Sequence, residues 1–331
     1  MSLKHANISI FVPHVGCPNR CSFCDQRSIT GRHIAPRPKD VIDAVRAAVT
    51  SANYDPENTE IAFFGGSFTA INRTYMLHLL ETACTFVENG VVKGIRISTR
   101  PDSVDDEILE ILKQHHVTAI ELGAQSLDDM VLLLNNRGHT AKDVETASAR
   151  IKRHGFELGL QMMTGLYCDD DETAIKTAKK IIEIAPDTVR IYPTIVLQKT
   201  DLAALYYDEK YRPQTLEEAV ALAAVLTDMF EQAGIRVIRV GLHSIEENSF
   251  VAGPWHPAFS ELCSSQRFFK KALSLLEKEG NYKIYVHPSA VSKMTGQKRI
   301  NLTKLAEIGY NCKVVADPEL EPAQLRTERI D

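Results

Sequence analysis

The alternation of short apolar runs with longer amphipathic runs is the feature that most constrains the fold of this chain. Runs rich in apolar or β-branched residues predict strands at 7–12, 60–64, 94–97, 117–122, 157–163 and 188–195. Between them, apolar residues at helical spacing predict helices at 39–50, 73–88, 104–115, 141–154 and 171–184. Repeated strand–helix units imply an α/β fold with a parallel sheet, either open and doubly wound or curved into a (β/α) barrel. In both arrangements the chemistry is expected at the carboxyl ends of the strands.

A change of composition follows the sixth predicted strand. Residues 198–216 are polar and rich in tyrosine, and a long helix (216–233) and a strand (235–241) are predicted after them. The remainder predicts a loop, a helix, a strand, a second loop and helix, and a frayed acidic tail. We therefore expect a main domain over residues 1–240 and a small C-terminal α/β domain, for substrate or partner, over residues 245–331.

The charge balance limits the partners of the chain. Its 331 residues include 38 Lys and Arg against 43 Asp and Glu, a formal net charge of −5. This excludes a generally basic nucleic-acid coat but allows a local basic patch. No signal peptide is evident, and no uncharged apolar stretch reaches the roughly 20 residues of a membrane span. The odd number of cysteines, seven, argues for a reducing compartment. We expect a cytoplasmic protein without membrane contact.

Three of the cysteines, Cys17, Cys21 and Cys24, form a C-x3-C-x2-C motif after the first predicted strand. Three thiolates so close together can surround one face of a metal centre. A structural zinc site, with His14 as a fourth ligand, would normally take two separated ligand pairs, and the nearby sequence offers no second pair. The interpretation we favour is a [4Fe–4S] cluster with one iron open to a substrate or cofactor.

This motif, with the aromatic Phe23 before its last cysteine, resembles the signature of the radical S-adenosylmethionine (SAM) superfamily. The resemblance implies a partial (β/α)6 TIM-like barrel with the cluster at its C-terminal rim and SAM on the open iron. An external electron donor of the flavodoxin or ferredoxin type would allow reductive cleavage of SAM to a 5′-deoxyadenosyl radical, which abstracts hydrogen from a substrate.

Further motifs resemble the SAM contacts of that superfamily. A Gly-Gly turn ends the second strand, where the absence of side chains lets the backbone approach a ligand closely. An arginine twelve residues after the end of the fourth strand suits the SAM carboxylate, because its guanidinium can bind both oxygens. The resemblance implies that SAM is contacted by Gly65, Gly66, Ser67, Ser98, Gln125, Arg137 and Gln161.

The motifs at 121–126, 136–140 and 190–202 resemble the radical SAM half of the Elongator catalytic subunit and, more distantly, oxygen-independent coproporphyrinogen III oxidase. The Elongator subunit has an acetyltransferase domain after its barrel, and we expect none here because the chain ends too early. Porphyrin decarboxylation is not expected, because Phe11 occupies the position of a tyrosine in the oxidase.

The substrate stays open at this point. The Elongator resemblance favours an RNA, specifically a tRNA base, whereas the net charge of −5 favours a small metabolite. A non-catalytic zinc-binding RNA or scaffold module is the alternative from a different class. Lys298 and Arg299 belong to a basic run that could grip phosphate or be a solvated loop. Cys168, Cys263 and Cys312 match no second cluster motif, and neither the reaction outcome nor the oligomeric state can be inferred.

Overall fold

The computed structural model describes residues 5–12, 21–24, 35–242 and 247–330. Within these ranges the main body is a seven-stranded parallel sheet in the order β1-β2-β3-β4-β5-β6-β8. Its strands are β1 (Ala6–Val12), β2 (Thr59–Gly65), β3 (Gly94–Thr99), β4 (Val117–Gln125), β5 (Glu157–Thr164), β6 (Thr188–Pro193) and β8 (Arg236–Val240). The strand order rises without a reversal. A doubly wound sheet would reverse its order at a switch point, so the structure confirms the partial barrel.

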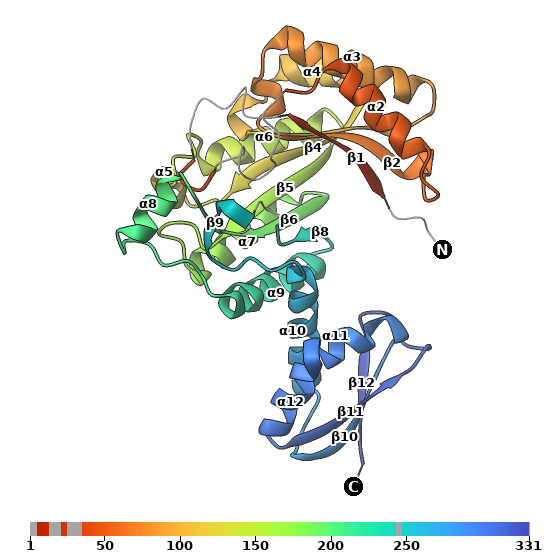
Figure 1. Ribbon diagram of the computed structural model, residues 1–331, viewed down its shortest axis with the longest axis vertical. Helices are drawn as coiled ribbons and strands as arrows, with labels where there is room; N and C mark the ends of the chain where they lie inside the picture. The colour runs from red at the N-terminus through yellow and green to blue at the C-terminus, as the bar shows by residue number, and fades with distance from the viewer. Residues whose placement is uncertain (1–4, 13–20, 25–34, 243–246, 331) are drawn as a thin grey trace.

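Helices cover the outer face of the curved sheet (Figure 1). They are α2 (Pro38–Val49), α3 (Arg73–Glu88), α4 (Asp106–Gln114), α6 (Ala141–Arg153), α7 (Asp171–Ile184) and α9 (Leu216–Gln232). Side chains of Asn72, Asp105, Thr140, Asp170 and Thr215 accept hydrogen bonds from backbone N–H groups of the first turns, which explains where five of these helices begin.

Several short elements were not predicted from the sequence. The helices α5 (Asp129–Leu134) and α8 (Asp201–Tyr207) each span fewer than three turns, too few to show a clear periodicity. Strands β7 (Val196–Leu197) and β9 (Phe250–Ala252) form a separate two-stranded antiparallel sheet. The described 3-10 turns are η1 (Pro56–Asn58), η2 (Phe68–Ala70), η3 (Pro101–Ser103), η4 (Glu247–Ser249), η5 (Pro288–Ala290) and η6 (Gln297–Arg299).

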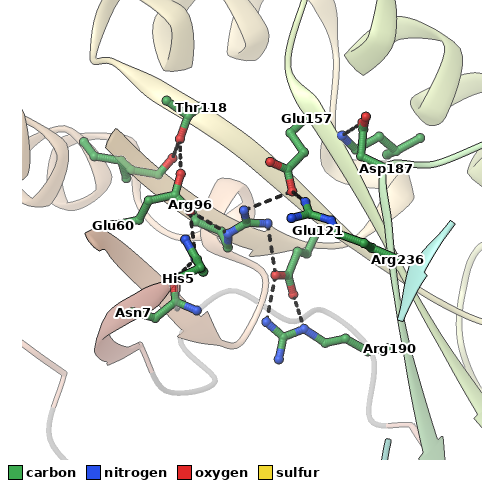
Figure 2. Close-up of polar contacts among 12 residues, drawn as sticks. His5, Asn7, Glu60, Arg96, Thr118, Glu121, Glu157, Asp187, Arg190 and Arg236 are labelled. Carbon is green, nitrogen blue, oxygen red and sulfur yellow. Dashed lines mark hydrogen bonds and ion pairs between the residues drawn. The ribbon is translucent and has the colours of Figure 1, made fainter. Parts of the chain in front are cut away.

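Charged side chains fill part of the concave side of the sheet (Figure 2). Buried Arg96 pairs with Glu60 at 3.0 Å, with Glu157 at 3.1 Å and with Glu121 at 3.4 Å. Glu121 also binds Arg190 through both carboxylate oxygens, at 2.7 and 2.8 Å. Burial opposes the charge of Arg96, but the three glutamates more than offset it and raise its pKa. The buried charges are therefore mutually neutralised, as a low-dielectric interior requires.

Helix α10 (Phe259–Leu273) connects the barrel to a second hydrophobic core (Figure 1). Phe259 and Cys263 belong to the barrel core, whereas Ala272 belongs to the C-terminal core. The latter lies under a three-stranded sheet in the order β11-β10-β12, where β10 and β11 are parallel and β12 is antiparallel. Its elements are β10 (Gly280–Val286), α11 (Val291–Thr295), α12 (Ile300–Glu307), β11 (Tyr310–Ala316) and β12 (Leu325–Arg329).

The expectation of a frayed acidic tail was wrong. Residues 310–316 and 325–329 are both strands. In the first of them Tyr310, Cys312 and Val314 alternate onto the C-terminal core. This is a period-2 pattern that the intervening polar residues obscure. No helix in the described ranges is long and apolar enough to cross a membrane.

Candidate active site at the strand ends

The carboxyl ends of the barrel strands surround a cavity of about 270 Å³. Two cysteines of the sequence motif, Cys21 and Cys24, lie on its wall, whereas Cys17 and His14 lie outside the described residues. The same cavity is lined by all of the residues expected to contact SAM: Gly65, Gly66, Ser67, Ser98, Gln125, Arg137 and Gln161. The fold thus gathers residues from five strands and the loops after them. Their role as SAM contacts stays a prediction.

Arg137 connects the cysteine segment to the end of β4. Its Nη1 donates to the Sγ of Cys21 at 3.1 Å, and its Nη2 donates to the carbonyl oxygen of Gly123 at 2.6 Å. The side chain is buried, its Nε has no hydrogen-bond partner within the described part of the chain, and no carboxylate there forms an ion pair with it. A buried cation in this state favours an anionic group nearby. Thiolates, an anionic iron–sulfur cluster and the SAM carboxylate all suit that charge.

Asn135 holds Ser22, between the two described cysteines, through hydrogen bonds. This side chain is fully buried, and its Oδ1 accepts hydrogen bonds from the Ser22 hydroxyl at 2.8 Å and from the Tyr167 N–H at 3.3 Å. Its Nδ2 donates to the carbonyl oxygens of Val131 and Tyr167 at 2.8 and 2.9 Å. Its backbone carbonyl accepts from the Ser22 N–H at 3.1 Å. Asn135 therefore ties the loop after β5 to the residue between the two described cysteines, a role that the sequence did not indicate.

The Gly-Gly turn after β2 depends on the absence of side chains. Gly65 has φ +115°, and a Cβ there would lie 2.5 Å from both the Val12 carbonyl oxygen and the Phe11 ring. The next N–H, of Gly66, donates to the same Val12 oxygen at 2.9 Å. Ser67 follows, and its hydroxyl lies 2.7 Å from that of Thr99, at the end of β3. The turn is thus held against two neighbouring strands, and it leaves backbone facing the cavity.

A bulge turns the end of β4 toward the cavity. The register between β4 and β5 shifts between Gly123 and Gln125, and Gln125 adopts a left-handed conformation with φ +65°. Its Oε1 accepts a hydrogen bond from Gln161 Nε2 at 3.0 Å. Bulges and left-handed non-glycine residues are frequent at functional sites because they redirect side chains. The hydroxyl of Ser98 forms no hydrogen bond with another described residue, so it is available to a ligand.

Two further cavity residues were not among the predicted site residues. Glu121 and Tyr192 both line the cavity, and both contact Arg190 of the buried network. A charged residue inside a predicted apolar strand was the available signal for Glu121. Close to the cavity, His139 is buried and its Nε2 lies 3.2 Å from the Ala124 carbonyl oxygen. Burial first, and the charge of Arg137 second, lower the pKa of His139 to about 4, so it is neutral at pH 7.

Comparison with known families agrees with this geometry. Residues 11–181, more than half of the chain, match the Radical SAM superfamily. Residues 186–268 match the Radical_SAM C-terminal domain. The first match includes the end of β1, the cysteine motif and the four strands β2 to β5, and the second includes β6, α9 and most of α10.

Parts of the chain are also similar in sequence to individual proteins. The chain is 23% identical over 240 residues to a tRNA uridine(34) acetyltransferase of Dehalococcoides mccartyi, covering 62% of this chain and 52% of that protein. It is 28% identical over 188 residues to Elongator complex protein 3 of Saccharomyces cerevisiae, covering 51% of this chain and 34% of that protein. The chain thus spans about half the length of the first relative and a third of the second.

A solved structure shows the same fold. Elp3 of the archaeon Methanocaldococcus infernus, with an N-terminal deletion, aligns with a TM-score of 0.66 and 21% sequence identity, covering 82% of this chain and 64% of that one. The superfamily match covers more than half of the sequence, the sheet is a partial barrel, and Cys21 and Cys24 of the motif lie at the carboxyl ends of its strands. This chain is therefore an enzyme of the radical SAM superfamily.

Proposed function

We propose that this enzyme uses a [4Fe–4S] cluster, held by Cys17, Cys21 and Cys24, to cleave SAM reductively and to abstract hydrogen from a substrate. The observation that carries the proposal is the position of Arg137, whose guanidinium lies between a cysteine sulfur and the end of β4 in one cavity. When bound, the cluster would pass one electron to the SAM sulfonium, whose C5′–S bond breaks to methionine and a 5′-deoxyadenosyl radical. A flavodoxin- or ferredoxin-type donor would supply that electron.

In this proposal, different residues of the cavity bind different groups of SAM. Arg137 would bind the carboxylate, and its hydrogen bond to Cys21 would stabilise negative charge on that sulfur. The backbone at Gly65 and Gly66 would lie against the amino group. The pair Gln125 and Gln161, already joined by a hydrogen bond, would present amide groups to the ribose or the adenine. Apolar neighbours such as Phe23 and Met163 would keep water from a reactive radical.

A tRNA base is the substrate that we propose. The support lies in the named relatives, which include a tRNA uridine(34) acetyltransferase, together with the basic groups of the C-terminal domain described below. In this proposal residues 1–240 form the catalytic unit, and residues 245–331 bring the substrate to its rim. A small metabolite is the competing substrate, because the net charge of −5 does not favour general contact with RNA.

Anaerobic reconstitution tests the chemistry. The expected result is a brown protein with about four irons per chain that releases 5′-deoxyadenosine from SAM after reduction. Cys21→Ser should lose the cluster and the product, whereas Cys168→Ser, at an exposed cysteine outside the cavity, should keep both. One zinc per chain with no 5′-deoxyadenosine would overturn the proposal in favour of a non-catalytic zinc-binding module.

A further inference from the structure

The C-terminal domain contains a groove that the proposed chemistry does not use. It has a volume of about 660 Å³ and lies between α12 and the strands of the small sheet. The polar residues that line it include Arg299 at the N-cap of α12, Thr303 of α12, Asn281 of β10, and Asn311 and Lys313 of the edge strand β11. None of the described residues that line it is an aspartate or a glutamate. The groove therefore offers hydrogen-bond donors and positive charge without a competing anion.

The two cations among these residues, Arg299 and Lys313, are not neutralised within the described part of the protein. Neither Arg299 nor Lys313 forms an ion pair with any carboxylate in the described ranges. Lys313 also lies directly opposite Lys283 in the register of β10 and β11. Like charges on neighbouring strands destabilise a sheet. On its other side, Lys283 lies opposite Glu328 of β12, so the uncompensated charge is that of Lys313, at the edge strand. Because Tyr282 and Cys312 face the core, Lys283 and Lys313 lie on the open face of the sheet, where a bound anion would relieve this repulsion.

The open face of the same sheet carries a flat stack of an arginine on a tyrosine, in which Arg326 also pairs with Asp317 at 3.5 Å and the Tyr285 hydroxyl donates to Glu328. Tyr282, Ile284 and Val286 point into the core, and helices α10, α11 and α12 lie on that side of the sheet (Figure 1). The intervening Tyr285 is on the opposite face, where the guanidinium carbon of Arg326 lies 4.1 Å from the centroid of its ring. Arginine planes and tyrosine rings are the surfaces on which unpaired nucleic-acid bases stack.

We propose that the C-terminal domain is an RNA-binding module. Arg299 binds a phosphodiester group in the groove, Lys313 binds one on the open face of the sheet, and the stack of Arg326 on Tyr285 receives an unpaired base. This inference rests on the proposed function, since it supplies the docking surface for a tRNA substrate whose reacting base enters the barrel. An RNA would explain both features, because its phosphates suit the uncompensated cations and its unpaired bases suit the Arg326–Tyr285 stack. An acidic protein partner would explain only the cations.

Binding of unmodified tRNA to the full chain, measured by fluorescence anisotropy over a series of salt concentrations, tests the proposal. The variant R299Q/K313Q removes both proposed phosphate contacts, and K278Q/K304Q removes two charges of the same domain that do not line the groove. We expect the first pair to weaken binding at least about tenfold and to reduce the salt slope by about 1.4, since each contact with single-stranded RNA contributes about 0.7. The second pair should change the affinity less than about twofold. Tyr285→Ala should weaken binding with no change in the salt slope.

Release of 5′-deoxyadenosine from SAM without RNA shows that each variant is folded, and it separates the two proposals. Equal losses of tRNA affinity in the two double variants would overturn the proposed phosphate contacts of Arg299 and Lys313, because such losses would reflect only the overall charge of the domain. Wild-type binding by R299Q/K313Q would overturn them as well, while leaving a tRNA substrate in place. Failure of the wild type to bind tRNA while it cleaves SAM would overturn both the module and the RNA substrate. Absence of SAM cleavage with normal tRNA binding would instead overturn only the proposed chemistry.

Discussion

The guanidinium of Arg137 donates a hydrogen bond to the sulfur of Cys21 across 3.1 Å, although 116 positions separate the two residues in the sequence. The contact exists because α5 and the segment after it return along the rim of the barrel. There Asn135 holds Ser22, and Arg137 reaches the preceding cysteine. One short segment thus holds residues 21–24, which include two of the motif cysteines, and presents a buried positive charge to them.

Substitution of Arg137 should change the electronic properties of the proposed [4Fe–4S] cluster. We expect Arg137→Gln to lower its midpoint potential by at least about 40 mV, because a hydrogen bond to sulfur favours the reduced, more negative state. This figure is a net bond energy of about 1 kcal/mol converted for one electron. Redox titration followed by electron paramagnetic resonance measures it. Arg212→Gln, at an exposed ion pair with Glu218, is the matched control. An unchanged potential in R137Q would contradict the prediction.

Asn135 should matter for stability and for cluster assembly. Asn135→Ala leaves the Ser22 hydroxyl and two backbone groups of Tyr167 without partners in a buried site. We expect a loss of about 2–4 kcal/mol in the free energy of unfolding, measured by denaturant titration, and a lower iron content after reconstitution. Asn89→Ala removes one exposed hydrogen bond at a helix end and should cost less than about 1 kcal/mol. If both variants behave alike, Asn135 is not a positioning residue.

Substitution of two glycines with positive φ, one beside the cavity and one in open space, tests whether the Gly-Gly turn is sterically required. At Gly65, a Cβ would lie 2.5 Å from a backbone oxygen, whereas at Gly90, with φ +65°, no atom lies within 4 Å of it. We expect Gly65→Ala to lose at least about 3 kcal/mol of stability or to displace the turn from the cavity. Gly90→Ala should cost only about 1 kcal/mol, the ordinary strain of a left-handed residue. Comparison of their thermal unfolding midpoints and SAM affinities checks this, and equal effects would count against a sterically required turn.

The raised pKa of the buried Asp169 carboxyl should make the free energy of unfolding depend on pH. Burial is the main reason that its pKa rises from 3.8 to about 7, although its Oδ2 accepts a hydrogen bond from the Gly165 N–H at 3.1 Å. The folded state therefore binds more protons than the unfolded state between about pH 4 and 7. The contribution of this carboxyl to the free energy of unfolding thus falls as the pH rises through that window. Asp169→Asn should remove this contribution and flatten the curve of unfolding free energy against pH. Parallel curves for the variant and the wild type would refute the prediction.

The sequence by itself determined the class of fold and predicted where the candidate site lies. Alternating apolar runs have a length and spacing that only a parallel α/β arrangement buries well, and parallel strands bring their carboxyl ends to one rim. For that reason motifs as distant as those of Gly65, Gln125 and Gln161 could be expected around one cavity before any coordinates were known. The three cysteines of one loop indicated the metal chemistry in the same way, because their spacing is local.

The tertiary structure alone decided which side chains contact one another. Asn135 and Glu121 acquire their roles from partners distant in the sequence, and Tyr192 from its position on the cavity wall, and no local pattern marks these relationships. The strands β11 and β12 likewise form only because β10 lies between them. Local periodicity reports how each segment buries its own apolar side. Hydrogen bonds and ion pairs between segments depend on distances that exist only after the chain has folded, so the sequence indicates the groups but not their pairing.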